Sequence, residues 1–337
     1  MPDPTRVERI AHTAASPEGE NSTYVLPDVG LVVDPGPPGE APWETLTAGL
    51  RSVGLPVDAV ETVAVTHWHA DHAGLAPRLA AAAEAELVLH EDDAPLVADY
   101  AAARERRLDR DAKRLQEWGV PESTVDATVG GDTPSPMPDT YPVRTVTDGD
   151  SVAGTEALHT PGHTAGHLAL RSGNALLVGD AVLPTYTPNV GGSDTRLDAA
   201  LSTYLDTLGG LGERAGSSGA PGAEADPDAY PGHGPTVDLS GRIRTIRNHH
   251  AERVRDAVGA LPGPSDDVDG PGMTPWTVAC DLFGRMEGIH AKMGAGEAAA
   301  HLAFAADRGF AERVGEAPDR YVRAAGKTDL DLDADDL

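Results

Sequence analysis

Four side chains of the kind that bind metals stand close together near the start of the chain. They are His67, His69, Asp71 and His72, in the segment ETVAVTHWHADHAG, residues 61–74. Imidazole and carboxylate groups are ligands that Zn²⁺ prefers in proteins, and iron and manganese accept the same donors. Crowded groups of this kind are costly to bury unless a cation lies among them. The spacing therefore predicts a metal site.

The residues before this cluster are expected to position it. Residues 62–66, TVAVT, are apolar or β-branched and carry no charge, which is typical of a buried strand. A short strand that ends in such a cluster directs several imidazoles and a carboxylate into one small volume. A pair of histidines alone would more often be structural, but four ligands in this arrangement favour a metal.

The same stretch carries a resemblance to a known family. THWHADHAG resembles the HxHxDH signature of the metallo-β-lactamase superfamily of metallohydrolases. That family has three more ligands downstream, and all three have counterparts here in the right order. They are His163 in HTPGHTAGH, Asp180 in ALLVGDAVL and His233 in AYPGHGP. The resemblance covers residues 5–240 and implies an α+β fold, the four-layer αβ/βα metallo-β-lactamase sandwich.

The resemblance also implies two metal ions, expected to be Zn²⁺, with Fe or Mn as alternatives. The ligands would be His67, His69 and His163 for the first ion, and Asp71, His72 and His233 for the second. Asp180 would bridge the two ions together with a water or hydroxide. Two such cations lower the pKa of a shared water toward neutrality. Asp71 is the predicted catalytic residue, placed to orient the hydroxide and to pass its proton to the leaving group.

Length and composition favour one large domain and a smaller one. The chain has 337 residues, of which 40% are hydrophobic. Its 54 acidic against 26 basic residues give a formal net charge of −28, which is typical of halophilic proteins. One cysteine, Cys280, excludes an intramolecular disulfide. Neither a secretory leader nor a membrane span is evident, so we expect a cytoplasmic protein with no membrane partner.

Three domains are predicted. Residues 1–240 form the catalytic domain, with a flexible, low-complexity insertion at 209–228. Residues 241–317 resemble the small helical, winged-helix-like C-terminal domain of the lactamase-β-like branch, although Ala305-Ala306 replaces a leucine of that pattern. Residues 318–337 form an acidic tail, expected to be disordered.

Alternation and turn residues predict the elements that position the ligands. The expected strands are residues 6–12, 21–26, 30–34, 62–66, 86–90, 141–150 and 151–160, with a hairpin over 167–180. The expected helices are residues 42–52, 75–86, 92–118 and 197–208, followed by the helices of the C-terminal domain. Residues 130–140 are expected to form a loop.

The predicted function is hydrolysis of a thioester, an ester or a related small-molecule acyl substrate by a metal-bridged hydroxide, as in glyoxalase II. True β-lactamases of this fold have cysteine where Asp180 stands, so a role in antibiotic resistance is not expected. Single-stranded RNA is the alternative substrate, which would make the chain an endoribonuclease. An oxidoreductase with a di-iron site on the same fold is the alternative from another class.

Several other side chains keep two interpretations. The Arg/His-rich segment 242–255 is either an ion-paired helix or an anion-recognition patch. His167, near the site, is expected to support a ligand or to pack, and Thr160 and Thr164 either bond to ligands or serve as turn hydroxyls. The remaining histidines are expected to be structural. The sequence leaves open whether the chain forms a homo-oligomer.

Overall fold

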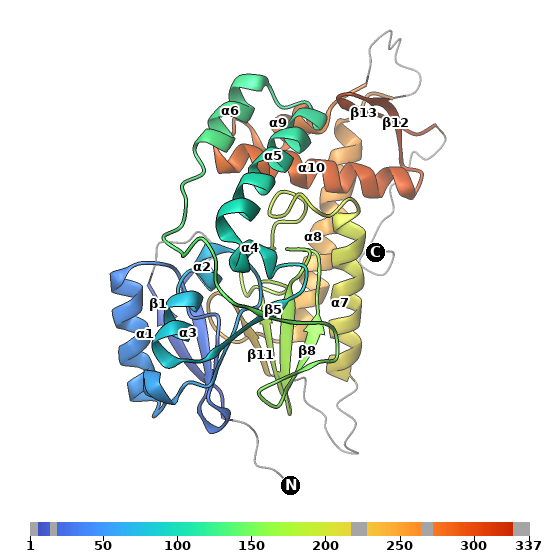
Figure 1. Ribbon diagram of the computed structural model, residues 1–337. Helices are drawn as coiled ribbons and strands as arrows, with labels where there is room; N and C mark the ends of the chain where they lie inside the picture. Colours follow the sequence, from blue (N-terminus) through green and yellow to red (C-terminus); the bar gives the residue numbers. More distant parts are fainter. Residues whose placement is uncertain (1–5, 14–18, 217–227, 264–271, 326–337) are drawn as a thin grey trace. The chain divides into compact units, whose positions relative to one another are not determined.

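The computed structural model describes residues 6–13, 19–216, 228–263 and 272–325 (Figure 1). It divides into two compact units, each built from three segments of the chain. The sheet unit comprises Met1–Arg104, Pro134–Pro188 and Thr207–Ile243, and the helical unit comprises Glu105–Thr133, Asn189–Asp206 and Arg244–Leu337. The sequence predicts that the helical domain begins at residue 241, whereas the helical unit also takes two segments from within the first 240 residues.

The first sheet of the sheet unit has six strands in the order β1-β2-β3-β4-β5-β6. Its strands are β1 Glu8–His12, β2 Asn21–Leu26, β3 Leu31–Val33, β4 Thr62–Ala64, β5 Glu86–His90 and β6 Arg144–Val146. The first three strands pair antiparallel, and β3 to β6 run parallel. The carboxyl ends of these parallel strands therefore meet along one edge, where β4 leads into the predicted metal cluster.

The second sheet has five strands in the order β11-β10-β9-β8-β7. Its strands are β7 Ser151–Val152, β8 Thr155–His159, β9 Leu168–Ser172, β10 Ala175–Gly179 and β11 Asp228–Pro231. The predicted hairpin between β9 and β10 is confirmed, with Ser172 paired to Ala175. Because β10 and β11 run parallel, Asp180 and His233 both follow carboxyl ends at one edge.

Alternating side chains of the strands build two cores on either side of the first sheet. Leu31 and Val33 of β3 join a cluster that contains Leu168 and Leu170 of the second sheet, so the two sheets pack face to face. Val32, between them, points to the opposite face.

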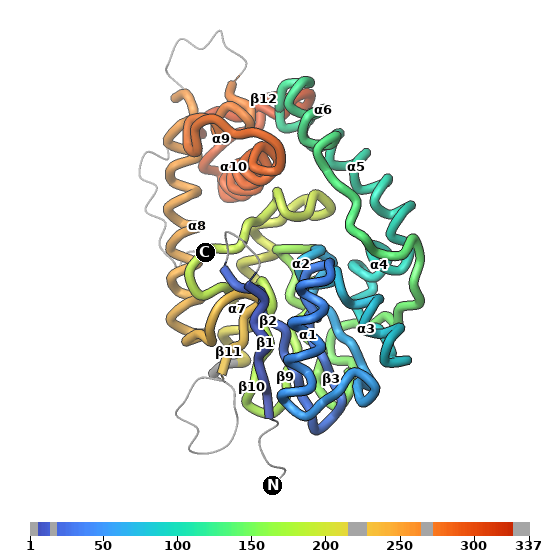
Figure 2. Tube along the Cα trace, turned by 90° about the vertical axis from the view of Figure 1, so that its left-hand side faces the viewer, coloured from blue at the N-terminus to red at the C-terminus, as the bar shows by residue number. Residues whose placement is uncertain are grey.

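That opposite face is covered by helices α1 Glu40–Ser52 and α3 Ala76–Ala83, whose Leu46, Leu50 and Leu79 are buried in the same core. On the far side of the second sheet lies helix α7, Ala200–Gly216, whose part from Thr207 onward places Leu208 and Leu211 in the interior. Figures 1 and 2 both show α7 beside the second sheet. The predicted four-layer sandwich is confirmed.

Helices make up most of the helical unit, in which a two-stranded sheet follows α10. Helices α2 and α4 below belong to the sheet unit. The remaining helices of the chain are α2 Ala70–Ala73, α4 Pro95–Ala98, α5 Tyr100–Glu117, α6 Glu122–Gly130, α8 Leu239–Ala260, α9 Pro275–Phe283 and α10 Ile289–Asp307, with short 3-10 turns at Pro27–Val29 and Val57–Ala59. Strands β12 Ala311–Glu316 and β13 Asp319–Arg323 pair antiparallel.

Helix α9 illustrates how the sequence sets the limits of a helix. Thr274 accepts a hydrogen bond from the Thr277 backbone N–H, and proline occupies the first turn, where no N–H is needed. Gly284 follows with φ 76°, a conformation that glycine adopts without strain.

Several predicted boundaries differ from the structure. The helix expected over 92–118 is divided into α4 and α5, because Asp99 leaves helical geometry with φ −130° and ψ 51°. Helix α6 occupies residues that were not assigned, and its last residue, Gly130, falls in the predicted loop. Residues 209–216 of the predicted insertion continue α7, and Asp228 begins β11, so the insertion was wrong at both ends.

The predicted acidic tail was also wrong at its start. Residues 319–323 form β13, because Tyr321 is buried and the strand pairs with β12. The rest of the insertion, 217–227, and the rest of the tail, 326–337, lie outside the described residues. Among the segments that are described, none of the helices combines the length and apolar character that a membrane span requires.

A buried ion pair lies within the helical unit. The Lys292 ammonium on α10 donates to Asp111 Oδ2 on α5 at 2.7 Å. Both side chains are nearly inaccessible, at 4% and 3% exposure. Thr195 Oγ1 donates to the other oxygen of Asp111 at 2.7 Å, and Arg107 contacts Oδ2 at 3.2 Å. The carboxylate therefore links α5, α10 and the 189–206 segment.

Replacing Asp111 with alanine should destabilise the protein by about 3–5 kcal/mol, because it leaves a buried ammonium without its carboxylate. Urea unfolding followed by circular dichroism measures the difference. The matched control is Glu287→Ala, which removes one partner of the exposed pair Arg285–Glu287 and should cost less than about 1 kcal/mol. Equal effects of the two substitutions would show that the buried pair does not stabilise the helical unit.

Candidate metal centre

The first ligand cluster lies at the carboxyl end of β4, as the sequence predicts. His67 and His69 are in the loop after the strand, while Asp71 and His72 belong to helix α2. His67 and His72 are buried, and Asp71 keeps 39% of its side chain exposed. The centre is therefore accessible to solvent at Asp71, which suits a side chain that exchanges protons with a substrate.

The other three predicted ligands come from the edge of the second sheet. His163 lies in the loop between β8 and β9, Asp180 directly follows β10, and His233 follows β11. All three are buried. The structure brings all seven predicted residues into one cluster, although they come from segments far apart in the chain.

The ligating atoms form overlapping groups. Those of His67, His69 and His163 lie within 4.8 Å of one another, and the same is true of Asp71, His72 and His233. These are the two sets of three that the resemblance implies. Asp180 forms a further group with His67 and His72, and its Oδ2 lies 3.8 Å from His163 Nε2 and 3.4 Å from His233 Nε2. It is within reach of both sets.

Two observations on these atoms are consistent with cation binding: the distances between them, and the lack of hydrogen-bond partners for two of them among the described residues. His163 Nε2 and His69 Nδ1 lie 3.1 Å apart, and His72 Nε2 and His233 Nε2 lie 3.3 Å apart. Two nitrogens bound tetrahedrally to one Zn²⁺ would be about 3.3 Å apart. Within the described residues, His67 Nε2 and Asp180 Oδ1 are buried without a hydrogen-bond partner. Such atoms are rare unless something else binds them, so the cluster can hold metal.

The pKa values of the imidazoles in the cluster are shifted in two opposite directions. Burial lowers the pKa of His69 to about 3, helped by the neighbouring His163. Burial would lower the pKa of His72 too, but the carboxylates of Asp180 and Asp71 outweigh it and raise that pKa well above its usual value. The pKa of His233 is raised to about 9, because Asp180 and Asp71 outweigh its burial.

Asp34, the last residue of the strand predicted over 30–34, contacts the cluster. Its Oδ1 accepts from the Thr66 backbone N–H at 2.7 Å, and its Oδ2 lies 3.0 Å from His72 Nδ1. A ligand imidazole whose second nitrogen is held in this way has a fixed ring orientation. Asp34 itself has φ 51°, an uncommon conformation for a residue other than glycine.

Asn21 is a second supporting residue that sequence reasoning missed. Its Nδ2 donates to Asp71 Oδ2 at 3.1 Å and to the Asp71 carbonyl at 3.2 Å. In the sequence it is only the first residue of a predicted strand. A polar residue at the start of an otherwise apolar strand was the available signal.

His167 contacts Asp180, one of the seven predicted ligands. Its Nε2 accepts from the Asp180 backbone N–H at 3.0 Å, and its Nδ1 lies 2.7 Å from Thr160 Oγ1. Gly232 lets the backbone approach the centre closely, since a Cβ there would lie 2.2 Å from Asp180 Oδ1. Thr164 donates to the carboxylate of Asp93.

The Arg/His-rich segment is used largely for internal contacts. Arg242 donates to the carbonyls of Leu183 and Tyr186. Arg253 pairs with Glu297 at 3.2 Å, and the buried His250 lies against His301 with facing nitrogens 3.0 Å apart. These contacts favour the structural interpretation over an anion-recognition patch.

Comparison with known proteins agrees with the geometry. The family model of the metallo-β-lactamase superfamily matches residues 15–238. The chain belongs to the metallo-β-lactamase superfamily. A crystal structure of a metallo-β-lactamase family protein from Thermus thermophilus, TTHA1429, is 28% identical, with a TM-score of 0.70 over 94% of this chain and 98% of that one. A β-lactamase domain protein from Burkholderia ambifaria, 24% identical with a TM-score of 0.69, shares the fold over 94% of this chain and 91% of that one.

Two curated relatives match shorter parts of this metallo-β-lactamase superfamily chain. The probable metallo-hydrolase YqjP of Bacillus subtilis is 28% identical over 169 residues, which is 48% of this chain and 52% of that protein. The lactamase-like protein adaB of Aspergillus niger is 25% identical over 235 residues, which is 68% of this chain and 55% of the relative. The chain spans about half the length of these relatives.

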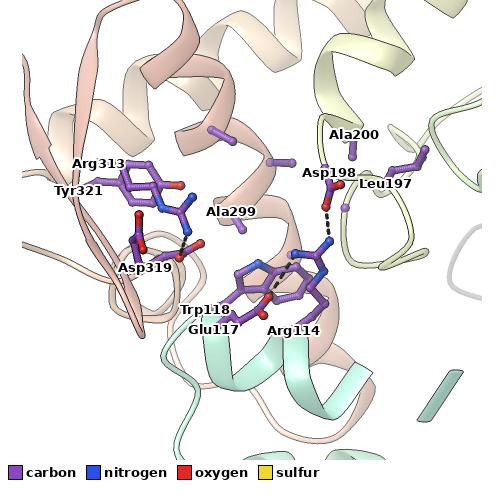
Figure 3. A pocket seen from close by; sticks show the side chains of 15 residues that line it. Arg114, Glu117, Trp118, Leu197, Asp198, Ala200, Ala299, Arg313, Asp319 and Tyr321 are labelled. Atoms are coloured by element: carbon purple, nitrogen blue, oxygen red, sulfur yellow. Dashed lines mark hydrogen bonds and ion pairs between the residues drawn. The ribbon is translucent and has the colours of Figure 1, made fainter. Parts of the chain in front are cut away.

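A cavity of about 490 Å³ is lined by residues of the helical unit, and none of the seven cluster residues is among them (Figure 3). Arg114 lines it and is paired with Glu117 at 3.1 Å and with Asp198. Arg313, which also lines the cavity, is paired with Asp319. Since both arginines already contact carboxylates, the cavity offers little positive charge to an anion.

Metal binding should release about two protons per chain at pH 7, because His72 and His233 carry protons that must leave before their nitrogens can bind a cation. The pKa of His233, about 9, exceeds its usual 6.5. Its proton therefore stabilises the metal-free fold fully below pH 6.5, and that contribution is lost as the pH rises through 9. Metal affinity should accordingly increase between these two pH values.

Titration calorimetry of Zn²⁺ binding in buffers of different ionisation enthalpy measures the released protons directly. His233→Asn should remove about one of them. Binding without proton release, or with an affinity that does not change from pH 6.5 to 9, would contradict the assignment of these two imidazoles.

Proposed function

We propose that the chain is a metal-dependent hydrolase that cleaves a small thioester, ester or related acyl substrate. The observation that carries the proposal is the convergence of seven imidazole and carboxylate side chains into three overlapping groups, in which some buried atoms have no hydrogen-bond partner among the described residues. The name of the relative YqjP, a probable metallo-hydrolase, points in the same direction. A cluster that is costly to bury is difficult to explain by stability alone.

The residues of the cluster would have different roles in such a hydrolysis. His67, His69 and His163 would hold one divalent cation and Asp71, His72 and His233 another, with Asp180 between them. Cations bound there would acidify a shared water and polarise the acyl oxygen. Zn²⁺ fits the donor set, and Fe or Mn fits it as well.

Asp71 is the residue best placed to move protons. Its carboxylate is the most exposed of those in the cluster, and Asn21 holds its Oδ2 from one side. Although burial opposes ionisation, His72 and a hydrogen bond from His233 lower the pKa of Asp71. An ionised Asp71 accepts the proton of the attacking water and returns it to the leaving thiol or alcohol.

The contacts made by the arginine side chains of segment 242–255 favour acyl substrates over RNA. An RNA backbone needs several basic side chains free to contact phosphates. Arg242, Arg247 and Arg253 instead contact backbone carbonyls or a carboxylate within the protein. A cytoplasmic, high-salt setting and a glyoxalase II-like substrate remain predictions, and so do the domain roles.

A hydrolysis screen at high salt tests the proposal. Thioesters, lactones and labelled single-stranded RNA are offered to the purified protein and to Asp71→Ala and Asp180→Ala. Thioester turnover should fall by about 10²–10⁴-fold in Asp71→Ala, because a group that transfers protons is lost. The control Asp58→Ala removes an exposed carboxylate and should leave turnover unchanged. RNA cleavage lost in both variants, with thioesters untouched, would reverse the choice of substrate.

Asn21→Ala should lower kcat about tenfold while metal content stays the same, because Asp71 keeps its ionised form but loses a partner that orients it. Steady-state kinetics with the best acyl substrate and elemental analysis measure the two quantities. The control is Asn174→Ala, an exposed asparagine in the turn between β9 and β10. An unchanged kcat in Asn21→Ala would show that the orientation of Asp71 does not limit turnover.

A further inference from the structure

Asp93 is a buried carboxylate that does not belong to the seven cluster residues. It connects the loop that carries His67 and His69 with the loop that carries His163. Asp93 follows β5 and has 0% of its surface exposed. Its Oδ2 accepts from the Trp68 backbone N–H at 3.2 Å and from Thr164 Oγ1 at 2.8 Å. Its Oδ1 accepts from the Gly166 backbone N–H at 2.9 Å.

These contacts lie directly beside one ligand group. Trp68 stands between His67 and His69 in the chain, and Thr164 follows His163. His163 Nε2 and His69 Nδ1, one from each loop, face each other at 3.1 Å. Asp93 therefore holds together the two loops whose histidine nitrogens face each other.

These contacts require a carboxylate, because the three groups named above all donate to Asp93. An ionised carboxylate only accepts, and hydrogen bonds to it are stronger than those between neutral groups. Asparagine would turn an N–H group toward one of these donors. Gly166 is part of the same fit, since a Cβ there would lie 2.5 Å from the Asp93 backbone nitrogen and 2.7 Å from Oδ1.

The other ligand group has different supports. Asp34 fixes the ring of His72 through Nδ1, and Asn21 holds Asp71. The three hydrogen bonds of Asp93 described above go to the loops of the first group instead. Loss of Asp93 should therefore disturb one group and spare the other.

We propose that Asp93 is a positioning residue that sets the spacing of His67, His69 and His163 and thereby the affinity of that group for its cation. The inference rests on the metal-dependent function proposed above. Residues that orient metal ligands typically change affinity by about 10–100-fold when they are replaced. One of the two ions should therefore bind about 10–100-fold more weakly in Asp93→Asn, with the other unchanged.

Competition between the protein and a chromogenic chelator for Zn²⁺ measures both affinities, and the visible spectrum of the Co²⁺-loaded protein reports the ligand geometry. The matched control is Asp58→Asn, the same chemical change at an exposed carboxylate of the sheet unit. It should bind both ions like the wild type. Thr164→Val, which removes one of the three donors, should weaken the same ion, and Thr164→Ser should restore its affinity.

Wild-type affinity for both ions in Asp93→Asn would overturn the proposal, and so would equal weakening of the two ions. Thermal unfolding of the metal-free variant shows whether it folds. If it does not, Thr164→Val decides, and an unchanged affinity there overturns the proposal as well. A wild type that binds two ions but hydrolyses none of the acyl substrates would refute the proposed function and leave the role of Asp93 standing. A wild type that binds no metal would refute both.

Discussion

The sheet unit is organised around five imidazoles and two carboxylates gathered in one place, most of them buried. Burying such groups is unfavourable unless each finds a partner of opposite charge or a hydrogen bond. The protein satisfies part of this need internally, through Asp34 on His72, His167 on Asp180 and Asn21 on Asp71. What remains is a set of nitrogen and oxygen atoms that face one another at the separations a cation would produce.

The two sheets make this convergence possible. Parallel pairing puts the carboxyl ends of β3, β4 and β5 along one edge, and β10 and β11 do the same in the second sheet. Face-to-face packing through Leu31, Val33 and Leu168 brings these two edges together. A rigid core thus fixes where the loops start, and short loops limit how far each ligand can move.

The sequence predicted the parts of the structure that local signals determine. Strand β2 was predicted at its true bounds, and the hairpin at Gly173-Asn174 followed from the turn residues. All seven candidate ligands could be named because His67, His163, Asp180 and His233 stand in recognisable motifs. The four-layer fold followed from the resemblance carried by those motifs.

The rest could not be predicted because it depends on contacts between distant residues. The glycines at 209 and 210 suggested a flexible segment, yet buried Leu208 and Leu211 keep α7 helical there. Residues 319–323 looked like part of an acidic tail until pairing with β12 and the burial of Tyr321 made them a strand. Asp93 and Asn21 have no motif of their own, and only their positions in space show what they hold.

The most direct test of the account is the anomalous diffraction of crystals of the metal-loaded protein, recorded at the absorption edge of the bound metal. The account predicts two peaks, one among His67, His69 and His163 and one among Asp71, His72 and His233, with Asp180 adjoining both. A single peak, or peaks elsewhere in the molecule with none in this cluster, would contradict it.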